Sequence, residues 1–183
     1  MLTTFVSKII LIIVRNSEIT TLYCRRKVTK DDLRCEACGT VDEVCSFIGL
    51  AKSLIKERKL KRILEGIQRD LFKIGSELAT NKGYIKKLKE RINKSSLDYL
   101  HNNIEELKEK IDLTKRGFII PGEDFVSSIV DVTRAITRRL ERRVVTVKRK
   151  KLLGNRYILP YLNKLSNLLY FIARYVEKKP RFK

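Results

Sequence analysis

Apolar residues recur every three or four positions along most of the chain after residue 36, and this period is typical of amphipathic α-helices. In the segment that begins at Leu60, for example, Ile63, Ile67 and Leu71 share one side of a helix. The period predicts five helices, over about residues 36–55, 60–78, 96–113, 124–148 and 157–178. The predicted fold class is therefore all-α, an antiparallel bundle of four or five long helices.

The segments between the predicted helices carry turn signals. Pro121 and Gly122 predict a turn, and Asp124 is suited to cap the N-terminus of the helix that follows. Pro160 falls in the first turn of the last helix, where its missing N–H costs little. These residues predict the same helix boundaries as the apolar period.

An apolar segment, "FVSKIILIIV", occupies residues 5–14. It is too short to cross a bilayer as a helix, which needs about 20 residues. It lacks a small-residue cleavage site, and its β-branched residues favour a short strand or a segment packed on a neighbouring chain. We therefore expect a cytoplasmic protein that does not enter a membrane.

Composition adds charge to this picture. The chain has 183 residues, of which 43% are apolar, and this suits one domain with a sizeable core. Its net charge of +20 points to anionic partners such as nucleotides, phosphate groups, nucleic acid or a membrane surface. Helices rich in Lys and Arg can equally serve solubility, so charge alone does not choose a partner.

Four cysteines lie close together in the sequence, at Cys24, Cys35, Cys38 and Cys45. The spacing of Cys35 and Cys38 is that of a zinc-binding pair, and all four thiols could form one site. No second such pair follows, and the single histidine, His101, is far away. Free, half-buried thiols in a reducing compartment are the favoured interpretation.

The segment "DVTRAITRRLERRVV" (131–145) carries five arginines and one glutamate. Like charges three or four residues apart on a helix repel each other by a few tenths of a kcal/mol. On a helical wheel Arg134, Arg138 and Glu141 lie opposite the predicted core, and Arg139 and Arg143 flank it. The predicted core positions are Ile129, Val132, Ile136, Leu140, Val144 and Val147. The ridge is either a solvated surface with weak ion pairs or a polyphosphate site enclosed by a second subunit.

Four blocks of sequence, in this order, resemble one known family. They are "KVTKDDLRCEACGTVDEVCSFIGLA" (27–51), "FIIPGED" (118–124), "RAITRRLERRVV" (134–145) and "YLNKLSNLLYFIARY" (161–175). Together they resemble the ATP:cob(I)alamin adenosyltransferases of the trimeric, five-helix-bundle type. The resemblance implies a bundle that is ferritin-like in style and assembles as a homotrimer, with sites between subunits.

The family resemblance also implies a reaction. Such an enzyme transfers the 5′-deoxyadenosyl group of ATP to the cobalt of cob(I)alamin and releases triphosphate. The reduced cobalt is the nucleophile, so no side-chain nucleophile is required. ATP and cob(I)alamin are the implied substrates, and Mg²⁺ is expected because triphosphate chemistry usually employs it.

Roles follow from the resemblance, residue by residue. The arginine block, the lysine after the N-terminal loop, two threonines and an asparagine match the ATP-binding positions, which are Thr20, Thr21, Lys30, Arg138, Arg139, Glu141, Arg142 and Asn163. Asp42 matches an acidic residue that pairs with Arg134 and fixes the corrin pocket and the subunit contact. Phe118 matches the aromatic residue that crowds the lower face of the corrin. The corrinoid set is thus Phe118, Asp42 and Arg134, and the catalytic set is Arg138, Arg134 and Asp42.

The chain departs from the family in the N-terminal phosphate loop. The family pattern T-x-T-G-D-x-G-x-T-S-L matches "IIVRNSEITTL" (12–22), where Arg15 and Glu18 replace the glycines and Asn16 replaces the aspartate. Such residues do not adopt positive φ cheaply, so we expect another conformation. We divide the chain into an N-terminal arm with a remodelled ATP loop (1–26) and the helical adenosyltransferase domain (27–183).

Two alternatives stay open. A relative with weakened ATP binding could still hold a corrinoid. A basic helical nucleic-acid-binding protein would explain the charge and the run "VKRKK" (147–151), and its affinity would fall steeply with salt. The aromatic residues of the last helix have helical spacing, which favours the core over base stacking.

Overall fold

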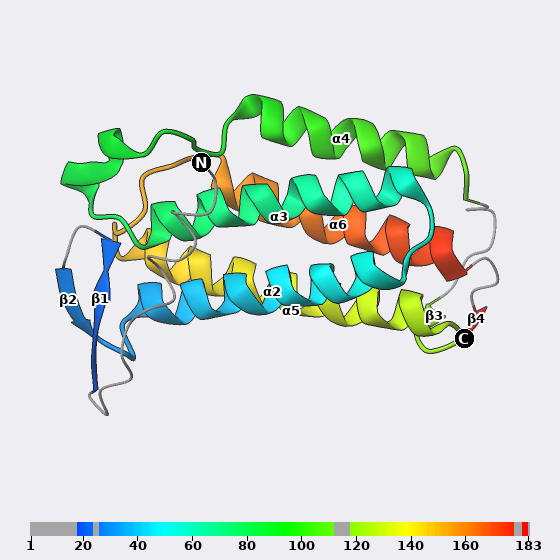
Figure 1. Cartoon of the computed structure of the whole chain (residues 1–183), viewed down its shortest axis with the longest axis horizontal. Coiled ribbons are helices and arrows are strands. Elements are labelled where there is room, and N and C mark those ends of the chain that lie inside the picture. Colours follow the sequence, from blue (N-terminus) through cyan, green and yellow to red (C-terminus); the bar gives the residue numbers. More distant parts are fainter. Residues whose placement is uncertain (1–17, 24–25, 112–117, 178–180, 183) are drawn as a thin grey trace.

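The computed structural model describes residues 18–23, 26–111 and 118–177, and the backbone of residues 181–182 (Figure 1). Five long helices dominate it: α2 (Leu33–Leu54), α3 (Arg58–Leu78), α4 (Lys94–Lys108), α5 (Phe125–Arg149) and α6 (Ile158–Glu177). They run up and down along one axis, which confirms the predicted all-α bundle. The apolar segment 5–14 lies outside the described residues.

The starts of α5 and α6 follow the predicted signals, and α4 has a cap that was not predicted. The Asp124 side chain accepts a hydrogen bond from the Ser127 N–H at 2.8 Å at the start of α5, and Gly122 has a φ of 126°, which favours glycine. Asn93 caps α4 by accepting from the Ser96 N–H at 3.2 Å. Pro160 lies in the first turn of α6, as expected. The largest boundary error is at α4, which ends five residues before the predicted position.

The core lies between the helices. Helix α5 packs against both α2 and α6, α2 packs on α3, and α4 covers α6. Fully buried side chains come from every long helix, and they include Val44, Ile48, Leu64, Ile67, Leu71, Ile74, Leu100, Leu140, Val144, Tyr161, Leu165 and Ile172. At about 25 cal/mol per Å² of apolar surface removed from water, this shared interior is the main stabilising term.

One predicted core position of α5 is wrong. Val132 is 46% exposed, whereas Val130, Thr133 and Thr137 are buried. Because α5 contacts helices on two sides, its buried face is wider than the apolar stripe. The buried hydroxyls of Thr133 and Thr137 replace their lost bonds to water by donating to carbonyl oxygens one turn earlier, at 2.7 and 2.8 Å.

Short non-helical elements occupy the two ends of the bundle. An antiparallel hairpin, β1 (Ile19–Leu22) and β2 (Arg26–Thr29), precedes α2 and pairs Ile19 with Thr29 and Leu22 with Arg26. The 3-10 helix η2 (Lys82–Lys87) lies at the same end. At the other end β3 (Ile119–Ile120) pairs with β4 (Arg181–Phe182). The all-α prediction omitted both strand pairs.

Candidate active site

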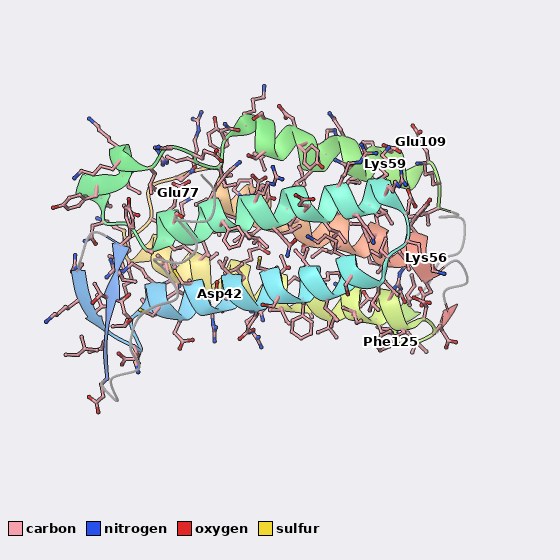
Figure 2. The ribbon with its side chains drawn as sticks, viewed as in Figure 1. Asp42, Lys56, Lys59, Glu77, Glu109 and Phe125 are labelled. Atoms are coloured by element: carbon pink, nitrogen blue, oxygen red, sulfur yellow. The ribbon has the colours of Figure 1, made fainter. Side chains whose placement is uncertain are left out.

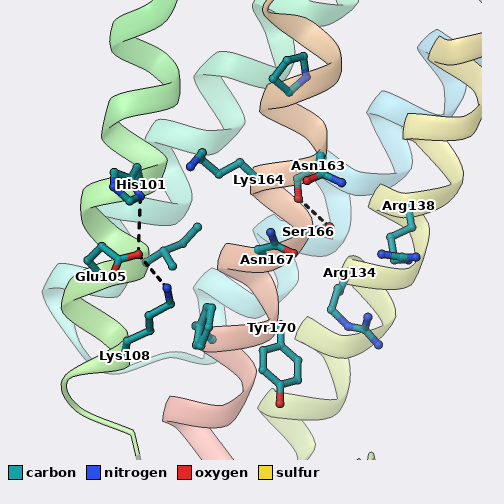
Figure 3. A pocket seen from close by; sticks show the side chains of 13 residues that line it. His101, Glu105, Lys108, Arg134, Arg138, Asn163, Lys164, Ser166, Asn167 and Tyr170 are labelled. Atoms are coloured by element: carbon teal, nitrogen blue, oxygen red, sulfur yellow. Dashed lines mark hydrogen bonds and ion pairs between the residues drawn. The ribbon is translucent and has the colours of Figure 1, made fainter. Parts of the chain in front are cut away.

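A pocket of about 850 Å³ opens between α4, α5 and α6 (Figure 3). Its wall includes three of the predicted site residues, Arg134, Arg138 and Asn163. The other lining residues are His101, Ile104, Glu105, Lys108, Pro160, Lys164, Ser166, Asn167, Tyr170 and Phe171. Two of the three ridge residues, Arg134 and Arg138, therefore lie in the wall of a concave site.

Helical spacing explains how these side chains converge. Arg134 and Arg138 are four residues apart on α5, and Asn163, Asn167 and Tyr170 follow at intervals of four and three residues on α6. Residues at these intervals share a helix face, so each helix presents one row to the pocket. Figure 3 shows the α6 row between the arginines of α5 and the α4 side chains.

The pocket is strongly cationic. Lys108, Arg134, Arg138 and Lys164 line it, and Glu105 is the one carboxylate among its lining residues. Glu105 is already engaged, because Lys108 donates to it at 2.8 Å and His101 lies 3.6 Å from it. The Lys108 hydrogen bond lowers the pKa of Glu105. The field of the pocket therefore favours an anionic ligand.

Arg138 is the least engaged of these cations. Its side chain is exposed, and no hydrogen-bond or ion-pair acceptor contacts it within the described part of the chain. A guanidinium group offers five donors in a planar fork that suits phosphate oxygens. Arg138 is therefore free to bind an incoming anion.

Glu141 and Asn163 join the two helices that form this wall. The Asn163 amide donates to Glu141 Oε1 at 3.3 Å, from α6 to α5. Both residues were predicted to bind ATP, and the structure brings them together beside Arg138. The contact also compensates part of the repulsion that Glu141 would exert on an anion.

The other arginines of the block lie elsewhere. Arg139 forms an ion pair with Glu43 of α2, and Arg143 binds Glu36 of α2 at 2.9 Å. These contacts confirm that Arg139 and Arg143 flank the core, and they fasten α5 to α2. Arg142 is exposed and does not line the pocket.

The predicted partners Asp42 and Arg134 do not meet within one chain. Arg134 instead contacts Asp131 on its own helix, with 3.3 Å between Nε and Oδ1. Asp42 lies on α2 (Figure 2), and no hydrogen bond or ion pair holds it among the described residues. Partial desolvation raises the pKa of Asp42. A pair between Asp42 and Arg134 of neighbouring chains remains a prediction.

The remaining predicted residues lie at opposite ends of the bundle. Thr20 and Thr21 are in β1 and Lys30 follows β2, and none of the three lines the pocket. The hairpin is closed by a hydrogen bond from the Lys30 N–H to Glu18 O at 2.8 Å. Of the stretch 12–22 that matches the family's phosphate loop, Ile19–Leu22 form β1, and residues 12–17 lie outside the described residues. Phe118 precedes β3 at the other end, and its side chain is 85% exposed.

Several pocket residues were missed from the sequence. Asn167 and Tyr170 could have been found, because they continue the helical row that starts at Asn163. His101 and Lys108 could not, since they lie on a helix distant in sequence. The contact of α4 with α6 brings them to the site.

The described cysteines are not grouped with other potential metal ligands. Cys35, Cys38 and Cys45 are free and half-buried, as expected, whereas Cys24 lies outside the described residues. Across residues 18–23, 26–111 and 118–177, no three His, Cys, Asp or Glu side chains are grouped to hold a metal ion. Within the same ranges no helix is long and apolar enough to cross a membrane.

Comparison with known proteins agrees with the geometry. The family model for cobalamin adenosyltransferase matches residues 16–176. A corrinoid adenosyltransferase of Citrobacter freundii is 34% identical over 161 residues, covering 88% of this chain and 90% of the relative. One of Bacillus subtilis is also 34% identical, covering 84% and 79%.

A solved structure has the same fold. A variant PduO-type ATP:corrinoid adenosyltransferase from Lactobacillus reuteri, complexed with cobalamin and ATP, superposes with a TM-score of 0.85. It is 29% identical, and the match covers 92% of this chain and 95% of that one. By sequence, architecture and the cationic pocket on its arginine helix, the chain belongs to the cobalamin adenosyltransferase family.

Proposed function

We propose that the chain transfers the 5′-deoxyadenosyl group of ATP to the cobalt of cob(I)alamin, giving adenosylcobalamin and triphosphate. The observation that carries this proposal is the pocket in which Arg134, Arg138 and Asn163 converge, in a chain of this family. The electron pair of cobalt(I) forms the cobalt–carbon bond while the bond from C5′ to oxygen breaks. Both electrons of that bond leave with triphosphate.

The protein's task is to bind and to stabilise the leaving group. The unengaged guanidinium of Arg138 is placed to bind the triphosphate, on which negative charge grows in the transition state. Asn163 and Glu141 hold the nucleotide beside it, and their mutual hydrogen bond orients both. Phe118 and the Asp42–Arg134 pair shape the corrinoid side of the site.

We propose that a homotrimer completes each site. Thr20, Thr21 and Lys30 lie at the hairpin end of the bundle and do not line the pocket of their own chain. A neighbouring hairpin could bring them to Arg138, and a neighbouring α2 could bring Asp42 to Arg134. We also propose that ATP is bound by Arg142, which is exposed, and by Arg139, which forms an ion pair with Glu43.

The proposed function also includes a division of the chain into two parts and a role for Mg²⁺. Residues 1–26 supply the remodelled ATP loop, residues 27–183 supply the bundle, and β2 joins the two parts. Mg²⁺ would be held by the triphosphate oxygens, because the described residues offer no grouped ligands for it. We expect the enzyme to act in the cytoplasm.

An anaerobic assay tests the proposed reaction. ATP and chemically reduced cob(I)alamin are mixed with the purified protein, and the spectrum of the cobalt–carbon product and the release of triphosphate are followed together. We expect both to appear in equal amounts. Corrinoid binding without product at millimolar ATP would contradict the proposal and favour a corrinoid-binding relative.

A further inference from the structure

Asp131 bridges two arginines beneath the pocket. It lies on α5 and is 7% exposed. Its Oδ1 contacts Arg134 Nε at 3.3 Å, and its Oδ2 accepts a hydrogen bond from Arg174 Nη2 on α6. One carboxylate therefore connects an arginine that lines the pocket with one that lies beneath it.

Arg174 is a buried cation. It is 4% exposed, and besides Asp131 it pairs with the buried Glu177 at 3.2 Å. Burying such charges costs several kcal/mol per ion, so a pair of this kind is weak evidence for a stabilising role. Arg174 also lies 5.6 Å from the ring centroid of Tyr170, which lines the pocket. It thus touches two of the groups that support the pocket wall.

The contact with Asp131 leaves most of the Arg134 guanidinium available. Asp131 engages Nε, and no acceptor contacts Nη1 or Nη2 among the described residues. An unrestrained arginine side chain has many rotamers, and ordering it on binding would cost free energy. Asp131 restricts these rotamers in advance while the two terminal nitrogens remain free for a ligand or a neighbouring chain.

We propose that Arg174 is a positioning residue that acts through Asp131 to orient Arg134 and through its aromatic contact to orient Tyr170. This inference rests on the proposed function, because it assigns Arg134 to the corrinoid side of that site. Arg174 itself does not contact substrate. Removing it leaves Asp131 free to turn and lets the Arg134 side chain sample other rotamers.

A double-mutant cycle tests this coupling. Arg174→Lys keeps the charge but lacks the planar fork that can hold two carboxylates. We expect it to raise the corrinoid KM or lower kcat about tenfold while the ATP KM changes less than about twofold. In an Arg134→Ala background the same substitution should have almost no further effect on corrinoid parameters. Asp131→Asn should behave in the same way and serves if Arg174→Lys does not fold.

A matched control separates positioning from stability. Glu77 at the end of α3 (Figure 2) is buried and accepts two hydrogen bonds from Arg91, at 2.9 and 3.0 Å, and it does not line the pocket. Glu77→Gln should lower the thermal midpoint and leave corrinoid parameters unchanged. If Arg174→Lys changes the corrinoid parameters by the same factor in the wild-type and in the Arg134→Ala background, the positioning role is wrong. An inactive wild type would instead refute the proposed function.

Discussion

The Asn163 amide donates a hydrogen bond to Glu141 across 3.3 Å, joining the α6 row of the pocket to the arginine helix. The two residues lie 22 positions apart in the sequence. The bond keeps the one carboxylate of the arginine block turned toward a neutral donor. It therefore bears directly on how the pocket accepts an anion.

Replacing Asn163 by aspartate should weaken ATP binding. The new carboxylate faces Glu141 at hydrogen-bond distance and adds negative charge to an anion site, so we expect the ATP KM to rise about tenfold or more. Steady-state kinetics with varied ATP measures this change. Asn163→Ser, which retains a small donor, should have a weaker effect. Equal ATP KM values for wild type and Asn163→Asp would remove Asn163 from the site.

Loss of Arg138 should reduce turnover. If its guanidinium stabilises the departing triphosphate, Arg138→Ala lowers kcat/KM on the order of 10²-fold or more. Arg149→Ala is the matched control, because Arg149 is an exposed arginine in the last turn of the same helix. It should leave kcat/KM within about twofold of wild type. An unchanged rate for Arg138→Ala would contradict its assignment.

Substitution of Asp42 or Arg134 should impair the use of the corrinoid more than the binding of ATP. Asp42→Ala and Arg134→Ala are each expected to raise the corrinoid KM or lower kcat more than they change ATP affinity. If the two residues pair between subunits, the exchange Asp42→Arg with Arg134→Asp should restore part of the loss. Analytical ultracentrifugation must accompany the kinetics, because equal loss of both substrates together with loss of the trimer would indicate misassembly instead.

Adjacent residues of α3 should differ in their effect on stability. Leu71 is fully buried, whereas the next residue, Phe72, is 65% exposed. Leu71→Ala should lower the free energy of unfolding by about 2–5 kcal/mol, because it removes buried methyl groups and leaves a cavity. Phe72→Ala should change it by less than about 0.5 kcal/mol. Urea unfolding monitored by circular dichroism compares them, and similar losses would show that Phe72 is covered in the assembly.

Ionisation of the Cys38 thiol should make the free energy of unfolding depend on pH in the alkaline range. Burial raises its pKa from 9.0 to about 12, so the folded state disfavours the thiolate. The contribution of the neutral thiol is complete below pH 9, and it is lost as the pH rises toward 12, because only the unfolded chain ionises in that window. The stability difference between wild type and Cys38→Ala should therefore shift against wild type as the pH rises above 9. A constant difference would show that the thiol ionises equally in both states.

The sequence by itself determined the helices and three of the residues that line the pocket, Arg134, Arg138 and Asn163. A period of 3.6 residues is a local property, so α3 and α5 could be placed to within two residues. Family blocks assigned Arg138 and Asn163, which do line the pocket. The helical-wheel prediction that Val132 is a core residue was wrong, because the width of the buried face of a helix depends on how many other helices pack against it.

Only the tertiary structure decided which side chains meet. The arginine block reads as one basic run, yet packing directs Arg138 into the pocket and Arg139 toward α2. Packing also brings His101 and Lys108 beside α6 and buries Arg174 against Asp131. These relationships depend on contacts between residues far apart in the chain. Periodicity records which face of a helix is apolar, but the partner of each polar residue is set by the helix packed against it.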